Sequence, residues 1–164
     1  MNDMEKADLS QLNIEDIDVA LNESNLFIKW RPIYETKHKI IDNQHKELVN
    51  IINELYLSTI NNANDSNGAF IKAVKKCIDY TQYHFKTEEK IMDLINYSDA
   101  ENHKAMHKNF CMELVNQIRK YEEGQPFVAN KFLKYLKDWL LEHIAFRDKI
   151  FVEEVIAYLK KNNI

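Results

Sequence analysis

The chain has 164 residues, which is long enough for one domain with its own hydrophobic core and no cross-links. Its 22 basic and 26 acidic residues give a formal net charge of −4, and the two signs are interspersed, which argues against binding to nucleic acid or to an anionic membrane surface. Two glycines and two prolines are too few for many strands and tight turns, so the composition favours long helices.

The first 25 residues are polar and acidic and contain no apolar run. They therefore predict neither a secretion signal nor a membrane span. We interpret residues 1–25 as an N-terminal extension and residues 26–164 as the folded domain. Cys77 and Cys111 are expected to be buried free thiols, which suits a reducing cytoplasm, and a disulfide between them is the less favoured alternative.

Apolar residues at spacings of three and four predict a first helix from about residue 37 to 60 and a second from about 69 to 96. Turn-forming residues 61–68 separate them. The inward positions of the first are Ile41, His45, Leu48, Ile52 and Leu55. Those of the second are Phe70, Val74, Cys77, Thr81, His84, Glu88, Ile91 and Ile95.

A third helix is expected to begin at a capping box of Ser98 and Glu101 and to end at Gly124. A fourth is expected from about residue 127 to 160, opened by Pro126. The inward positions of the third are His103, His107, Phe110, Leu114, Ile118 and Tyr121. Those of the fourth are Leu133, Leu136, Leu140, His143 and Phe151.

Short connections make neighbouring helices antiparallel, so the predicted fold is all-α: an up-down-up-down four-helix bundle with an N-terminal extension. His45 and His84 lie equally far from the middle of the first loop and should meet at one depth. The distances along the chain from Gly124 match in the same way for four further residues, His103, His107, His143 and Asp148. Across the connection between the second and third helices the corresponding distances match less well, which predicts a few non-helical residues before Ser98.

Several of these inward residues are potential metal ligands. A histidine and a ligand four residues later share a helix face, but one such pair alone more often consists of solvated or hydrogen-bonded core residues than of metal ligands. Their joint placement at matching depths favours a metal, because facing core carboxylates are costly without a cation. The expected ligands are His45, His84, Glu88, His103, His107, His143 and Asp148.

This donor set is too large for one ion. Five imidazoles, two bridging carboxylates and a bridging oxide or hydroxide would fill all but one position of two octahedral ions. Imidazole with carboxylate suits iron, zinc or nickel rather than calcium or magnesium. A pair of irons could pass two electrons to one dioxygen at the vacancy.

The five-residue step from His143 to Asp148 turns a regular helix about 140° beyond a full turn, so both side chains cannot share one face. We expect either a local π-type widening or an approach of Asp148 from the side. His38, near the start of the first helix, is expected to be partly exposed and not a ligand.

These motifs resemble those of the hemerythrin family, and most closely its bacterial branch, the bacteriohemerythrins. The resemblance covers about residues 26 to 160. It rests on Trp30, Tyr34, the stretch from Ile41 to His45, the spacings His84–Glu88, His103–His107 and His143–Asp148, and Trp139-Leu140. One departure is Lys37, where bacterial relatives often carry glycine.

The resemblance implies a non-heme di-iron centre. His103, His107 and His143 would complete a six-coordinate iron, and His45 and His84 would hold a five-coordinate one. Glu88 and Asp148 would bridge the two. A dioxygen pocket would be lined by Leu48, Leu140 and Ile144.

The implied function is reversible dioxygen binding for transport, storage or delivery, without catalysis. The alternatives are a di-iron enzyme (peroxidase, oxidase, nitric-oxide handling or iron repair) and an oxygen or redox sensor. Five neutral donors, two carboxylates and one vacancy favour holding dioxygen over splitting it, whereas ferritin-type enzymes use four carboxylates. The expected partners are dioxygen and a protein recipient or reductant, with no nucleic acid and no membrane.

Overall fold

The computed structural model describes residues 26–61, 66–123 and 129–163. The proposed extension (residues 1–25) and the predicted boundaries at Gly124 and Pro126 lie outside the described residues. The side chains of Phe70 and Tyr121 also lie outside the description. The elements are η2 (Pro32–Tyr34), α2 (Lys39–Asn61), α3 (Ser66–Ile95), α4 (Ala100–Glu122), α5 (Ala129–Glu142), η3 (His143–Asp148) and α6 (Lys149–Lys161). No strand occurs in these ranges.

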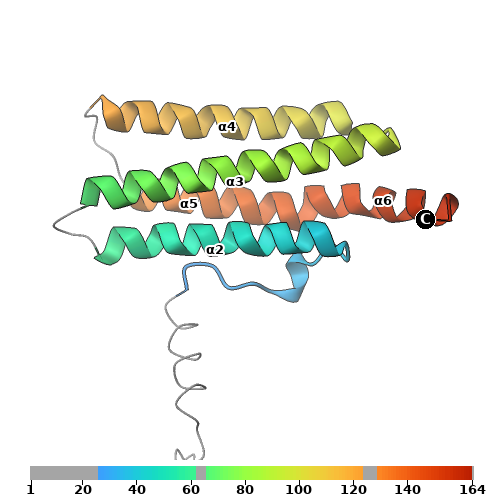
Figure 1. The fold of residues 1–164 in the computed structure, drawn as a ribbon, viewed down its shortest axis with the longest axis horizontal. Coiled ribbons are helices and arrows are strands. Elements are labelled where there is room, and N and C mark those ends of the chain that lie inside the picture. The colour runs from blue at the N-terminus through green and yellow to red at the C-terminus, as the bar shows by residue number, and fades with distance from the viewer. Residues whose placement is uncertain (1–25, 62–65, 124–128, 164) are drawn as a thin grey trace, which may run out of the picture.

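The predicted up-down-up-down four-helix bundle is confirmed. Helices α2, α3 and α4 and the continuous stretch α5–η3–α6 alternate in direction and lie side by side (Figure 1). The second helix begins earlier than predicted, at Ser66. No helix in the described ranges combines the length and the apolar content that crossing a membrane would need.

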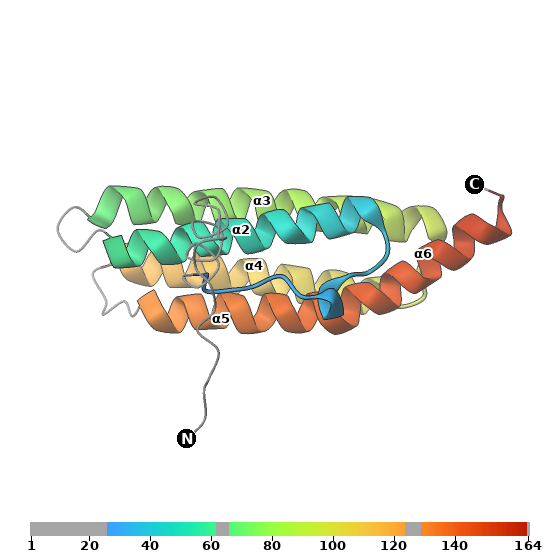
Figure 2. The same ribbon diagram turned by 90° about the horizontal axis from the view of Figure 1, so that it is seen from below.

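The fourth long helix changes geometry where the sequence led us to expect it. Residues His143–Asp148 form a π-helix, while Glu142 and Lys149 on either side keep ordinary helical dihedral angles. The wider turn brings residues five apart onto one side of the helix. Beyond it, α6 bends away from the line of α5 (Figure 2).

The connection between α3 and α4 contains the predicted non-helical residues. Asn96 follows the end of α3 with φ 53°, a left-handed conformation that asparagine tolerates, and the Tyr97 amide donates to the Met92 carbonyl at 2.9 Å. The predicted capping box does not match the start of α4, because the helix begins at Ala100 and is preceded by Asp99 rather than Ser98. The Ser98 hydroxyl instead donates to Glu154 Oε1 of α6 at 2.9 Å, because α6 passes beside this turn.

Residues 26–38 run along the bundle before entering α2 (Figure 2). The Asn53 side chain secures this segment, since its Oδ1 accepts from the Ile28 amide at 2.8 Å and its Nδ2 donates to the Ile28 carbonyl at 2.9 Å. Lys37 has φ 70°, the left-handed region that glycine enters without steric cost and that other residues adopt less readily. The entry is held by Asp42 Oδ1, which accepts from the Thr36 amide and hydroxyl at 2.7 and 2.8 Å.

The core consists of two apolar clusters. The larger one includes Leu48, Leu55, Val74, Phe85, Leu114, Leu136, Leu140 and Ile144. The smaller one is formed by Ile41, Met92, Tyr97, Phe151, Val152 and Val155. In α3 the fully buried residue of the smaller cluster is Met92, whereas the predicted Ile91 and Ile95 are half-buried. Cys77 is buried, Cys111 is half-buried, and both are free thiols.

Candidate metal centre

The seven predicted ligand side chains converge in the interior of the bundle. They come from α2, α3, α4 and η3, and each is at most 3% exposed. Along each helix they fall between residues of the larger and the smaller apolar cluster. The helices therefore enclose one polar layer between two apolar ones.

The donor atoms form two groups that share both carboxylates. The first group has three imidazoles, from His103, His107 and His143, and the second has two, from His45 and His84. Glu88 and Asp148 belong to both groups, and the donor atoms within each lie no more than 4.8 Å apart. This is an arrangement for two neighbouring cations bridged by carboxylates.

Glu88 divides its oxygens between the two groups. Its Oε1 lies 3.6 Å from His84 Nε2 and 3.9 Å from His45 Nε2. Its Oε2 lies 3.3 Å from His107 Nε2 and 3.9 Å from His103 Nε2.

Asp148 divides its oxygens in the same way. Its Oδ2 lies 3.0 Å from His45 Nε2, whereas its Oδ1 lies 3.2 Å from His103 Nε2 and 3.1 Å from His143 Nε2. Because His143 and Asp148 are the first and last residues of the π-helix, the wide turn is what allows one helix to supply both.

Two of the nitrogen–nitrogen distances in the three-histidine group match those between adjacent positions of an octahedral ion. His143 Nε2 lies 2.9 Å from His103 Nε2 and 3.1 Å from His107 Nε2. An octahedral ion with metal–nitrogen bonds of about 2.1 Å holds adjacent nitrogens about 3.0 Å apart. The three nitrogens therefore fit a single ion.

Hydrogen bonds fix the tautomer of His84. Its Nδ1 lies 3.0 Å from Gln44 Oε1, and an amide oxygen only accepts, so Nδ1 donates and the Nε2 lone pair faces Glu88. The orientation of the Gln44 amide follows from Thr87, whose hydroxyl donates to the Tyr83 carbonyl at 3.0 Å and so accepts from Gln44 Nε2 at 3.4 Å.

His107 is held in the same tautomer by a different group. Its Nδ1 donates to Glu89 Oε1 at 3.1 Å, so its Nε2 lone pair also faces into the centre. Sequence reasoning missed the parts played by Gln44 and Glu89. Gln44 and Glu89 are each next in sequence to an expected ligand, and the three-and-four spacing of inward residues does not mark either position.

Burial dominates the electrostatics of this polar layer. Burial lowers the pKa of His84 to about 3 and that of His107 to about 2, so both imidazoles are neutral at physiological pH. Burial also raises the pKa of Glu88 well above its usual value, with the Asp148 carboxylate adding to the effect. Burial alone would raise the pKa of Asp148, but the facing imidazoles, His143 first, hold it well below the ordinary value.

Unpaired atoms give a direct test of fit. Within the described part of the chain, buried side-chain nitrogen or oxygen atoms without a hydrogen-bond partner occur on His45, His84, Glu88, Asp148 and Trp30. All four carboxylate oxygens are among them. Nitrogen and oxygen lone pairs that face one another repel. A cation placed between these atoms would instead be bound by each of the lone pairs. The residues present therefore fit a pair of metal ions.

The comparison with protein families agrees with this geometry. Residues 36–155 match the family model described as the hemerythrin HHE cation binding domain. The chain belongs to the hemerythrin family.

Individual relatives span most of the chain. It is 29% identical over 126 residues to bacteriohemerythrin of Pseudomonas aeruginosa, covering 77% of this chain and 80% of that protein. Bacteriohemerythrin of Methylococcus capsulatus is 30% identical over 110 residues, covering 67% and 82%. The crystal structure of wild-type hemerythrin superposes with a TM-score of 0.70 at 27% identity, covering 77% of this chain and 96% of that one.

Aromatic rings pack against the histidines of this hemerythrin-family centre. Phe85 stacks on His107 with centroids 3.7 Å apart and planes within 4°. Trp139 stacks on His143 at 4.4 Å and 13°, and Phe110 stacks on Trp139 at 3.9 Å. The stacked rings restrict rotation of both imidazoles.

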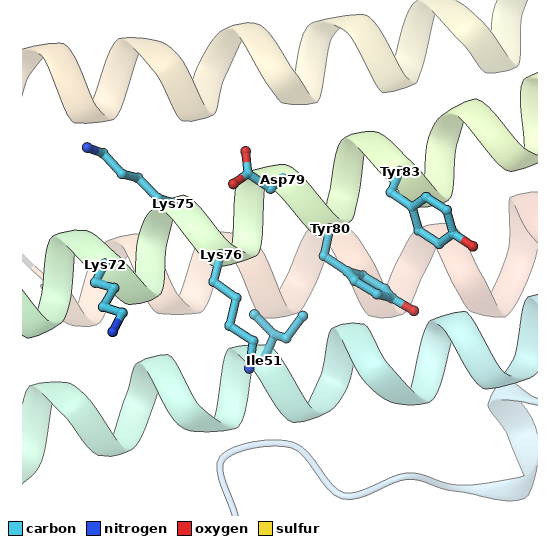
Figure 3. A pocket seen from close by; sticks show the side chains of 7 residues that line it. All are labelled: Ile51, Lys72, Lys75, Lys76, Asp79, Tyr80 and Tyr83. Carbon is cyan, nitrogen blue, oxygen red and sulfur yellow. The ribbon is translucent and has the colours of Figure 1, made fainter.

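Other candidates lie apart from the centre. His38 is half-buried at the start of α2, and its Nδ1 accepts from the Ile41 amide at 3.5 Å, so the expectation that it is partly exposed is confirmed. A surface hollow between α2 and α3 is lined by Ile51, Lys72, Lys75, Lys76, Asp79, Tyr80 and Tyr83 and contains none of the seven residues (Figure 3).

Proposed function

We propose that the seven residues hold two iron ions and that the protein binds dioxygen reversibly there. The observation that carries the proposal is the pair of shared carboxylates with three histidines on one side and two on the other. With an oxide or hydroxide bridge, the three-histidine position would have six donors and the two-histidine position five. The open position would then lie on the side of His45 and His84.

A bound pair of irons would supply the two electrons that dioxygen takes up. The chain itself supplies orientation and charge. Glu88 and Asp148 contribute two negative charges, and Gln44 and Glu89 keep the Nε2 lone pairs of His84 and His107 directed inward. Five neutral donors against two carboxylates support binding of dioxygen rather than cleavage of its O–O bond. The proposal is therefore a carrier or store and not an enzyme.

Leu48, Leu140 and Ile144 are proposed to line the dioxygen pocket. All three are buried and belong to the larger apolar cluster, next in sequence or one helical turn from His45 and His143. Apolar walls exclude water and its protons, which protects a reversible complex from oxidation.

The proposed domain is residues 26–164, with residues 1–25 as an extension, and the family match lies within it. The function also implies a protein that receives the dioxygen or reduces the irons. The free thiols Cys77 and Cys111 fit a reducing compartment such as the cytoplasm.

Iron analysis combined with spectra tests the proposal. The purified full chain, loaded with ferrous iron without air, is expected to hold two irons and to be colourless. Air should produce visible ligand-to-iron charge-transfer bands, and removing dioxygen should bleach them. Two irons with bands that do not bleach, or with sustained consumption of dioxygen, would overturn the carrier function while leaving the metal site intact.

A further inference from the structure

The two-histidine and three-histidine halves of the centre differ in the group that accepts a hydrogen bond from a histidine Nδ1, the ring nitrogen that faces away from the centre. In the two-histidine half, His84 donates to the neutral amide of Gln44 at 3.0 Å. In the three-histidine half, His107 donates to the carboxylate of Glu89 at 3.1 Å. The geometry of the two hydrogen bonds is nearly the same, so the main difference between them is one negative charge.

We infer that Glu89 is a positioning residue that strengthens His107 as a donor, so that the three-histidine position favours the ferric state more than the two-histidine position does. The inference rests on the two-iron centre proposed above. A hydrogen bond to a carboxylate is roughly twice as strong as one between neutral groups, and it raises the basicity of the imidazole. A more basic imidazole stabilises the more highly charged ion.

Partial burial raises the pKa of the Glu89 carboxyl, whereas the nearby cations Lys104 and Lys86 favour its charged form. The Glu89 side chain is 33% exposed, whereas that of His107 is 2% exposed, so the carboxylate remains hydrated while its partner is buried. The surface hollow that contains Glu89 also contains three lysines, Lys86, Lys104 and Lys108. Glu89 therefore connects the edge of the centre to a basic, solvent-facing hollow between α3 and α4.

The surroundings of Gln44 keep it neutral and correctly oriented. The amide is 6% exposed, and Thr87 determines which of its ends faces His84. It cannot supply charge to the imidazole. The three-histidine half thus has both the additional ligand and the anionic partner. The difference in ferric preference between the two iron positions is therefore larger than the number of ligands alone would produce.

Charge-changing variants of the full chain test this. In each one-electron oxidation of the loaded protein without dioxygen, one ferrous ion becomes ferric and its electron passes to a redox mediator. Glu89→Gln keeps a hydrogen-bond acceptor and removes the charge, so the potential of the first step should rise. The expected size is about tenfold in the ferric-over-ferrous preference, or about 59 mV. Gln44→Glu adds the charge on the other side and should lower the second potential.

The matched control is Asp93→Asn, one turn beyond Glu89 on α3. It also removes one negative charge, but Asp93 pairs with Lys104 and touches no histidine of the centre. Equal shifts in Glu89→Gln and Asp93→Asn would reduce the effect to general surface charge and overturn the inference. Unchanged potentials in both Glu89→Gln and Gln44→Glu would also overturn it.

Iron content separates this outcome from failure of the proposed function. A wild-type chain without two irons contradicts the centre itself, whereas a two-iron wild type with unshifted variants contradicts only the part assigned to Glu89. If Glu89→Gln does not retain iron, the Gln44→Glu variant still tests the inference. Its second one-electron potential is expected to fall, and an unchanged potential would overturn the inference.

Discussion

Glu88 and Asp148 lie on different helices, yet each presents one oxygen to His45 and the other to His103. The two carboxylates thus run in parallel between the same two sets of histidines. In an ordinary core such a pair would be destabilising, because two buried carboxylates repel and lack donors. Here the arrangement is explained by the cations that would lie between them.

Replacing Glu88 with glutamine should reduce iron content well below two per chain, because the amide cannot offer two anionic oxygens. The metal-free variant should be at least as stable as the wild-type chain, since a buried ionisable group is removed. Iron analysis and thermal unfolding of the metal-free protein measure the two effects. Glu101→Gln, an exposed change, is the control. A Glu88→Gln protein that keeps two irons would contradict the bridging role.

Replacing Leu140 with alanine should open the proposed dioxygen pocket. We expect a loss of about 2–5 kcal/mol in the free energy of unfolding and faster autoxidation of the oxygenated protein, because water gains access. Leu136→Ala is a matched control in the same helix and cluster, and it should lose similar stability without faster autoxidation. Equal autoxidation rates in the two variants would remove Leu140 from the pocket.

Replacing Asn53 with alanine should release the segment before α2. Both hydrogen bonds to the Ile28 backbone are lost, at a cost of about 1–3 kcal/mol for each group left unsatisfied. Amide exchange at Ile28 should accelerate, while iron content stays at the wild-type level. The exposed change Asn50→Ala should alter neither. Slow exchange in Asn53→Ala would show that other contacts hold the segment.

Acid should destabilise the metal-free protein. Below pH 6.5 the unfolded chain protonates His84 and His107, whereas the folded chain does so only near pH 3 and 2, so stability falls as pH falls. Glu88 acts in the opposite sense above pH 4.5, because its raised pKa lets the folded chain keep a proton that the unfolded chain loses. Glu88 therefore offsets part of the effect of the two histidines in that range.

Stability should therefore fall as the pH drops below 6.5, and fall more steeply below pH 4.5, where Glu88 no longer offsets the histidines. Urea unfolding of the metal-free chain at pH 7, 5.5 and 4 measures it. Stability that is constant, or that rises toward acid pH, would contradict burial of neutral histidines.

Periodicity was sufficient to predict the helices and the convergence of the seven side chains, because a side chain's face and depth follow from its position along a helix. It also predicted either a widened turn between His143 and Asp148 or a sideways approach of Asp148, and the structure has the widened turn. It could not predict that Ser98 bonds Glu154 or that Met92 is buried more deeply than Ile91, since both depend on how α6 approaches the end of α3.

The hydrogen bonds from His84 to Gln44 and from His107 to Glu89 were out of reach for a related reason. They join neighbouring helices at their margins, where the pattern of apolar residues carries no information. The left-handed turn at Asn96 likewise sets the register between α3 and α4, and it is fixed by backbone geometry that no spacing rule contains.

The most direct test of the two-iron centre is the crystal structure of the iron-loaded chain with anomalous scattering recorded at the iron edge. We expect two peaks, one among His103, His107 and His143 and one beside His45 and His84, with Glu88 and Asp148 bound to both. A single peak, or iron bound away from these side chains, would contradict the account.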